Sequence, residues 1–215
     1  MPTIRTLRRS DRPVTVGGGV LSRHGLSFGA HYDPGRTSFG ALVAHNDDVL
    51  DAGVAYGAHE HRDVEILAWV VDGTMIHTGP DGVETTVPAG TLQHLVAGTG
   101  WPHDERASED GAAHLLQFWV TPGLDDPPAG EPSLTHHTVD GSLTLPLRRP
   151  GVTVTVERAA AGEWRPGDGA FRHVHVARGA LGDAVAGDSL EITGAGPVAF
   201  EAGPDGAELV VVTTA

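Results

Sequence analysis

Two short segments of this chain place metal-binding side chains two residues apart. His59 and His61 form one pair, and His103 and Glu105 form a second pair further along the chain. In a β-strand, residues two apart point to the same face, so each pair can present both side chains to one point. Three imidazoles and one carboxylate would bind a single divalent metal ion, and we expect that chemistry here.

The ligand types decide which metals suit such a site. Nitrogen and oxygen donors of this kind accept Fe(II), Ni, Mn, Cu or Zn and leave open positions on an octahedral ion, which favours catalysis or ligand exchange. The chain has no cysteine, so disulfides, thiolate catalysis and iron–sulfur clusters are excluded. A His-x-His pair arises about once by chance in a chain with 13 histidines, so the second pair strengthens the prediction most.

The carboxylate ligand has two candidates. Glu65 would share a strand face with His59 and His61 if residues 59–65 form one strand, whereas Glu105 follows His103 by two residues. Spacing alone leaves both candidates open.

Other residues near the two segments are candidates for the wall of a cavity around the metal. They are His77, Gln93, His94 and Trp101, of which Trp101 is the tryptophan expected to lie closest to a ligand.

The elements that would position these side chains are predicted to be strands. Short runs rich in β-branched and aromatic residues are separated by turn residues, among 30 Gly and 15 Pro in the chain. This pattern is typical of an all-β sandwich or barrel. The strands that we expect are residues 38–44, 64–71, 114–120, 152–159, 173–179 and 207–214.

A segment rich in Pro, Gly and acidic residues suggests a division of the chain. We expect a metal-binding domain over 1–121, a linker over 122–133 and a second domain over 134–215. The second domain has its own His-x-His pair, His173 and His175, but no matching His-x-Glu segment. It is therefore expected to hold no metal.

Charge and hydropathy limit the classes of partner that the protein is expected to bind. The chain carries 28 acidic and 14 basic residues, for a net charge of −14, which argues against nucleic acid as a direct ligand. It has no uninterrupted apolar stretch near the ~20 residues of a membrane span, so no membrane partner is expected. The N-terminal basic residues lack the apolar segment of a secretory signal, and a cytoplasmic location is expected.

The order of several segments resembles a known family. The pattern Gly53-(five residues)-His59-x-His61-(three residues)-Glu65, followed by Gly100-x-x-His103, is similar to the two cupin metal motifs. The chain also resembles the pirin family of bicupins, which includes bacterial quercetin dioxygenase-like enzymes. This resemblance lies in residues 24–34, 46–73, 87–105 and 115–122. The resemblance implies an all-β fold of two cupin (jelly-roll) β-barrel domains, the second without metal.

The same resemblance implies a ligand set and an activity. The metal ligands would be His59, His61, His103 and Glu105, with Glu65 orienting a ligand histidine. Iron is the favoured ion, with Ni, Mn, Cu, Co or Zn as alternatives. The implied activity is a quercetin 2,3-dioxygenase-like reaction of a small aromatic such as a flavonol with dioxygen, in which Glu105 acts as the general base.

A second function also follows from the resemblance. Pirins include members that bind protein partners and modulate transcription or metabolic enzymes. A metal- or redox-sensing protein of this kind, with an acidic surface that selects basic partners, is the alternative to the enzyme.

Overall fold

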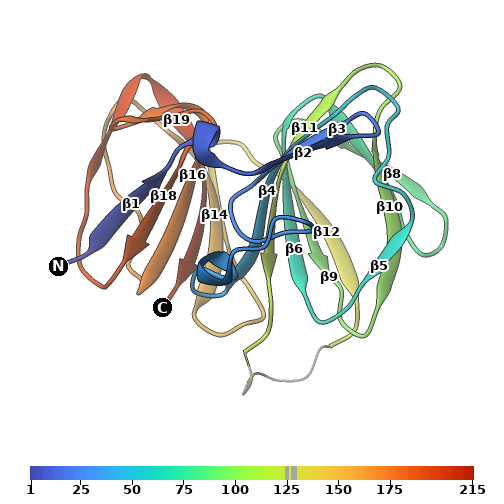
Figure 1. The fold of residues 1–215 in the computed structure, drawn as a ribbon, viewed down its shortest axis with the longest axis horizontal. Coiled ribbons are helices and arrows are strands. Elements are labelled where there is room, and N and C mark those ends of the chain that lie inside the picture. The colour runs from blue at the N-terminus through green and yellow to red at the C-terminus, as the bar shows by residue number, and fades with distance from the viewer. Residues whose placement is uncertain (124–125, 127–129) are drawn as a thin grey trace. The chain divides into compact units, whose positions relative to one another are not determined.

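The computed structural model describes residues 1–123, 126 and 130–215, and nearly all of its regular structure is β-strand (Figure 1). The expected all-β class is therefore confirmed. Part of the predicted linker, residues 124–125 and 127–129, lies outside the described residues. The described chain divides into a larger unit, Pro13–Thr37 with Val43–Thr138, and a smaller unit, Met1–Arg12 with Ser38–Leu42 and Val139–Ala215.

The larger unit contains two antiparallel sheets. A seven-stranded sheet has the order β12-β9-β6-β11-β4-β3-β2, and a four-stranded sheet has the order β5-β10-β7-β8. The strands are β2 (Val14–Gly17), β3 (Val20–His24), β4 (Leu42–Leu50), β5 (His59–His61), β6 (Glu65–Asp72), β7 (Thr74–Thr78), β8 (Glu84–Pro88), β9 (Thr91–Val96), β10 (Trp101–Ala107), β11 (Ala113–Val120) and β12 (Ser133–Thr138), and the short helix η2 is Pro34–Arg36.

Buried apolar side chains fix the strands that carry the metal-binding residues. Ala107, at the end of β10, packs in a core cluster with Leu50, Val70, Met75 and Leu115. Burial alternates along β10, so His103 and Glu105 share the buried face with Ala107. The core contact at Ala107 thus determines which face of β10 the two polar side chains occupy.

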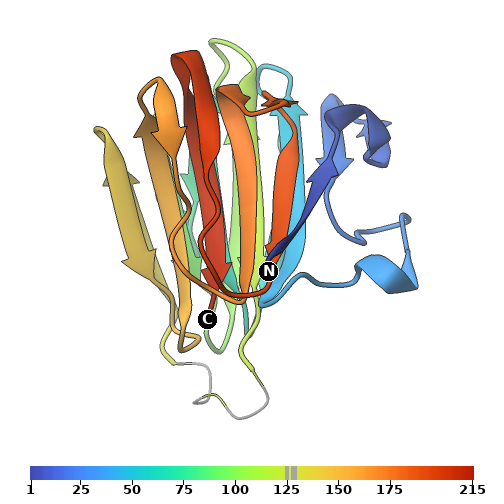
Figure 2. The same cartoon turned by 90° about the vertical axis from the view of Figure 1, so that its left-hand side faces the viewer.

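The smaller unit contains one eight-stranded sheet. Its main order is β1-β18-β16-β19-β14-β13, with β15 paired to β19 and β17 paired to β16 (Figure 2). The strands are β1 (Thr3–Leu7), β13 (Ser142–Pro146), β14 (Val152–Ala159), β15 (Gly162–Trp164), β16 (Phe171–Leu181), β17 (Ala184–Val185), β18 (Ser189–Thr193) and β19 (Phe200–Thr214), and the short helix η1 is Arg9–Asp11.

Strand pairing places two segments across the boundary expected from the sequence. The N-terminal strand β1 pairs with β18 of the smaller unit, and Arg8 just after it forms ion pairs with Asp183 and Asp188. Conversely, β12 pairs with β9 of the larger unit. The two units therefore do not coincide with residues 1–121 and 134–215. Strand pairing places β1 in the smaller unit and β12 in the larger unit, although the order of the chain suggests the opposite.

Five of the six predicted strands are confirmed, and one is displaced. The confirmed strands are β6, β11, β14, β16 and β19. The expected strand over 38–44 was wrong in position, because β4 begins at Leu42 and continues to Leu50. The middle of β4 is the polar run His45 to Asp48, which is buried although its residue types suggest a surface.

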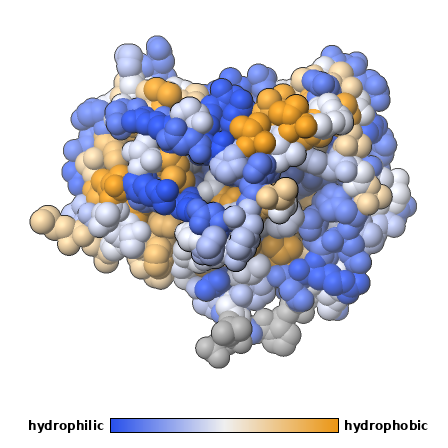
Figure 3. All heavy atoms as spheres, in the orientation of Figure 1, coloured by the Kyte–Doolittle hydropathy of each residue, from blue (hydrophilic) through white to orange (hydrophobic). Residues whose placement is uncertain are grey.

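Hydrophilic residues cover much of the face in Figure 3, and an apolar patch lies over β2 and β3. On β2, the side chains of Val14 and Val16 are 43% and 73% exposed. Among the residues that the structure describes, no helix is long and apolar enough to span a membrane.

Candidate metal centre

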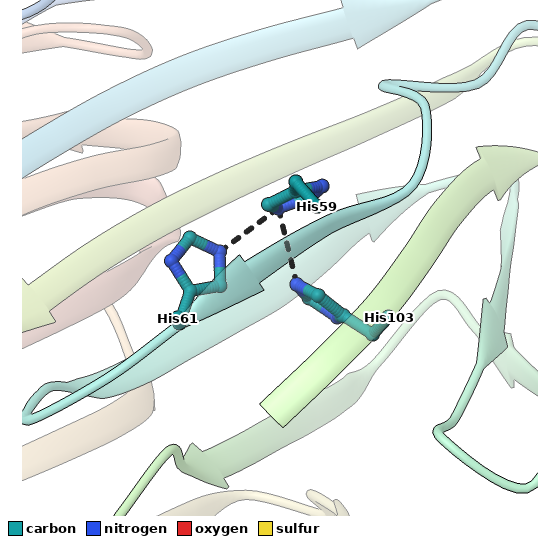
Figure 4. Close-up of side chains that lie close together, drawn as sticks. All are labelled: His59, His61 and His103. Carbon is teal, nitrogen blue, oxygen red and sulfur yellow. Dashed lines mark hydrogen bonds between the residues drawn. The ribbon is translucent and has the colours of Figure 1, made fainter. Parts of the chain in front are cut away.

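Three histidines from two paired strands meet in the larger unit. β5 pairs antiparallel with β10, so that His59 lies opposite His103. His61 follows His59 by two residues and therefore points to the same face. Figure 4 shows the three imidazoles directed toward one another. The convergence predicted for these three residues is thus present in the fold.

The distances between the imidazole nitrogens fit one metal ion. His59 Nε2 lies 2.9 Å from His61 Nε2 and 3.1 Å from His103 Nε2. Ligand atoms at adjacent corners of an octahedron, each about 2.1 Å from the ion, are about 3.0 Å apart. The spacing therefore matches three neighbouring positions around a six-coordinate ion.

The hydrogen-bond roles at His59 favour the same reading. His59 Nδ1 lies 2.7 Å from the carbonyl oxygen of Gly57, which can only accept, so Nδ1 carries a hydrogen, and in the neutral imidazole Nε2 then carries the lone pair. Two other imidazole nitrogens approach this one lone pair. A cation at the common point would satisfy the lone pairs of all three residues, and the donor set therefore fits a metal ion.

Glu105 lies beside this cluster and is held by its neighbours. Its Oε1 accepts a hydrogen bond of 2.6 Å from Gln93 Nε2 and lies 3.4 Å from His77 Nδ1. Glu105, His77 and His103 form a second group whose possible ligand atoms lie within 4.8 Å of one another. His103 belongs to both groups, so Glu105 adjoins the three histidines through it.

Burial would raise the pKa of Glu105, but polar neighbours reverse that effect. The hydrogen bond from His77 stabilises the carboxylate most, Gln93 adds a smaller hydrogen-bond contribution, and a proton on His103 or His77 would stabilise it further. The pKa of Glu105 consequently lies below its ordinary value. The group is therefore ionised near neutral pH, as a ligand or a base must be.

The second candidate carboxylate, Glu65, has different surroundings. Its Oε2 lies 2.8 Å from His94 Nε2, and His94 is not one of the three clustered histidines. The expected strand over residues 59–65 was also wrong, because Asp63 has a φ of 52° and interrupts the alternation between β5 and β6. Glu65 therefore does not share the face of His59 and His61, which β5 presents from the other sheet.

Two of the three histidines stay neutral at pH values well below 6.5, the ordinary pKa of a histidine side chain. Burial lowers the pKa of His61 to about 4 and that of His103 to about 4 as well. Neutral imidazole is the form that binds a metal. Because both folded pKa values lie below the 6.5 of the unfolded chain, the unfolded state takes up more protons, and the metal-free protein loses stability as the pH falls from 6.5 toward 4.

Metal affinity should therefore change little in mildly acidic solution. Two imidazoles of ordinary pKa would weaken binding about a hundredfold between pH 7.5 and 5.5, since each would be largely protonated. With His61 and His103 neutral to about pH 4, we expect a decrease of less than about tenfold. Calorimetric titration of the metal-free protein with Co(II) at the two pH values measures this. A hundredfold decrease would contradict the assignment of low pKa values.

A cavity of about 590 Å³ reaches the metal-binding residues. His59, His61 and Glu105 are part of its wall. Trp119 lies edge-on to His61 with ring centroids 4.8 Å apart, and Phe28 lies edge-on to Trp119 at 5.4 Å. The cavity therefore offers flat aromatic surfaces next to the three histidines, which suits a planar ligand.

Trp119 rather than Trp101 lines the cavity beside His59 and His61. Trp119 lines this cavity, whereas Trp101 lines a separate hollow with His77. Trp101 donates a hydrogen bond of 3.4 Å to His77 Nε2. Trp101 therefore contacts His77, which itself contacts Glu105, and does not line the larger cavity.

Several polar residues of the cavity wall were not predicted from the sequence. Asp48 is 2% exposed and accepts a hydrogen bond of 2.7 Å from the Tyr56 hydroxyl, and burial raises the pKa of Asp48 to about 6. Asn46 and Gln117 line the same cavity. No alternation of polar and apolar residues indicates them, because residues 45–48 are four consecutive polar residues and the predicted strand ends at residue 44.

The histidine pair of the smaller unit lies in a different environment. His175 Nδ1 lies 3.0 Å from Ser189 Oγ and 3.4 Å from an Arg12 nitrogen. His173 Nδ1 lies 3.8 Å from Glu191 Oε1. The absence of a metal from this unit stays a prediction.

The chain is similar in sequence to one family model and to named bacterial proteins. The model of the family described as Pirin matches residues 8–120. A Mycobacterium tuberculosis protein named "Putative quercetin 2,3-dioxygenase" is 32% identical over 224 residues, covering 90% of this chain and 88% of the relative. The quercetin 2,3-dioxygenase of Escherichia coli K12 is 43% identical over 106 residues, which cover 49% of this chain and 46% of that protein.

Solved structures agree with the architecture. The crystal structure of the bacterial pirin YhhW from Escherichia coli in complex with nickel(II) is 28% identical, with a TM-score of 0.86 over 99% of both chains. A quercetin 2,3-dioxygenase structure from Acinetobacter baumannii has a TM-score of 0.71 at 17% identity, over 97% of this chain and 78% of that one. The second likeness shows the fold alone, and the expected cupin architecture is confirmed.

Proposed function

The chain belongs to the pirin family, and from this premise we propose that it is a metal-dependent dioxygenase acting on a small hydroxylated aromatic such as a flavonol. The observation that carries the proposal is the set of three Nε2 atoms, two of them separated by 2.9 and 3.1 Å from that of His59, in a cluster of which His59 and His61 line an aromatic-walled cavity. A dioxygenase places both oxygen atoms in its products, so no external reductant is required.

One divalent ion would be held by His59, His61, His103 and Glu105. The crystal structure of YhhW in complex with nickel(II) supports a first-row metal ion in a protein of this fold, and the nitrogen and oxygen donors of this chain suit such an ion, with iron as the favoured one. Such an ion would supply Lewis acidity and a template for the substrate hydroxyl and dioxygen.

The protein groups would bind, orient and deprotonate the substrate. Trp119 and Phe28 offer flat surfaces against which an aromatic ring can stack, which restricts its approach to the histidines. Glu105 lines the same cavity and is ionised, so it can accept the proton of the substrate hydroxyl. Glu105 is 3% exposed, so little water reaches its carboxylate and its interactions are stronger than they would be in solution.

Turnover of flavonols tests the proposal directly. The metal-free protein is loaded separately with Fe, Ni, Mn, Cu and Co, and the loss of flavonol absorbance is followed in air and under argon. We expect oxygen-dependent loss with at least one metal. Loss that is independent of oxygen, or no loss with any metal, would contradict a flavonol dioxygenase.

A protein-binding role is favoured by one surface feature. β2 ends the order of the seven-stranded sheet and exposes Val14 and Val16, next to a cavity that Thr15 also lines. An edge strand with apolar side chains can accept a strand from a partner. Loss of a stoichiometric partner on Val16→Lys, with turnover unchanged, would favour this role.

A further inference from the structure

Gln93 connects the candidate ligand Glu105 to a histidine of another strand. On β9, Gln93 lies opposite His136 of β12 in the strand register. Its Nε2 donates to Glu105 Oε1 at 2.6 Å, and its Oε1 lies 3.0 Å from His136 Nε2. Gln93 is fully buried, whereas His136 is partly exposed. A chain of two hydrogen bonds thus runs from the metal-binding region to the outer strand β12.

The direction of each hydrogen bond in this chain is determined. An ionised carboxylate only accepts hydrogen bonds, so the NH₂ group of Gln93 must face Glu105. The amide oxygen of Gln93 then faces His136, and a hydrogen on His136 Nε2 is required for that contact. The state of His136 therefore decides whether the amide of Gln93 is held in the orientation that Glu105 needs.

Both contacts to Glu105 act on the same oxygen. Gln93 Nε2 and His77 Nδ1 each approach Oε1. Trp101 donates to His77 Nε2, which leaves the hydrogen of a neutral His77 on Nδ1, facing Glu105. With Oε1 engaged by two donors, Oε2 is the oxygen that can take a metal ion or a proton.

We propose that Gln93, held in orientation by His136, is a positioning residue that fixes Oε1 of Glu105 and directs Oε2 to the metal and to the substrate proton. The inference rests on the proposed metal site, but it assigns a role to two residues that are not ligands. Residues that orient ligands in this way commonly change metal affinity about 10- to 100-fold when they are replaced.

Co(II) is a suitable probe, because its visible spectrum responds to the number and type of ligands. For Gln93→Met, which keeps the volume but removes the amide, we expect Co(II) affinity to fall about 10- to 100-fold with a changed spectrum. For His136→Phe, which removes only the outer contact, we expect a fall of about three- to tenfold. His136→Gln keeps an N–H donor, and its affinity and spectrum should lie close to those of the unchanged chain.

His137→Phe is the matched control, because His137 is the neighbour of His136 on β12 but contacts Thr135 instead. It should leave Co(II) binding unchanged. Gln93→Met with unchanged affinity and spectrum, or equal effects of His136→Phe and His136→Gln, would overturn the inference. If the unchanged chain binds Co(II) but does not turn over flavonols, only the proposed function fails; if it binds no Co(II), both fail.

Discussion

Replacing His103 with alanine is expected to lower the affinity for a divalent metal by about a hundredfold or more. His103 is 5% exposed and its Nε2 lies 3.1 Å from that of His59. It also belongs to both groups of possible ligands, the one with His59 and His61 and the one with Glu105. Four protein ligands give a structural zinc site about 10–16 kcal/mol, or about 3 kcal/mol per ligand, which corresponds to about a hundredfold in affinity.

Metal content after dialysis and calorimetric titration measure the effect. His137→Ala is a matched control, since it removes an imidazole that belongs to neither group of possible ligands. We expect that control to bind metal within twofold of the unchanged chain. Because burial lowers the pKa of His103, its removal should not destabilise the metal-free fold at neutral pH through lost charge, and thermal unfolding checks this. Retention of metal by a folded His103→Ala variant would contradict the site.

The histidine cluster could be predicted because it depends on local geometry. Period-two alternation places His61 with His59 and Glu105 with His103 on any strand, and the pairing of β5 with β10 then brings the two pairs together. The same rule gave a wrong result for Glu65. Asp63 adopts a positive φ, and no local pattern distinguishes such a residue from one that continues the strand.

Residues of the cavity wall could not be predicted in the same way. Asp48 and Asn46 are buried on β4, where consecutive polar residues suggest a loop or an exposed edge. Their burial follows from strands β3 and β11, which flank β4 in the sheet. The contact of Gln93 with His136 likewise depends on the register of β9 with β12, which only the folded sheet fixes.

Replacing Glu105 with glutamine is expected to reduce turnover by about 10²- to 10⁴-fold, the range that general-base catalysis contributes. Glutamine has nearly the same shape and keeps an oxygen that can accept a hydrogen bond from Gln93, so the buried position of Glu105 should stay filled. It cannot accept a substrate proton at neutral pH, and it is a weaker ligand than a carboxylate. Metal affinity should therefore also fall, but by less than in His103→Ala.

The comparison with Glu65→Gln separates a specific role of Glu105 in turnover from the general effect of losing a buried charge. Glu65 is also buried, and it contacts His94 outside the histidine cluster. Turnover at saturating metal, measured for both variants, removes the contribution of weaker metal binding. We expect Glu65→Gln to retain most of its activity. An equal loss in the two variants would assign the effect to buried charge, and a larger loss in Glu65→Gln would restore Glu65 as the carboxylate that acts on the substrate. If only Glu105→Gln loses turnover while it still binds metal, the carboxylate beside the three histidines acts as a base and not solely as a ligand.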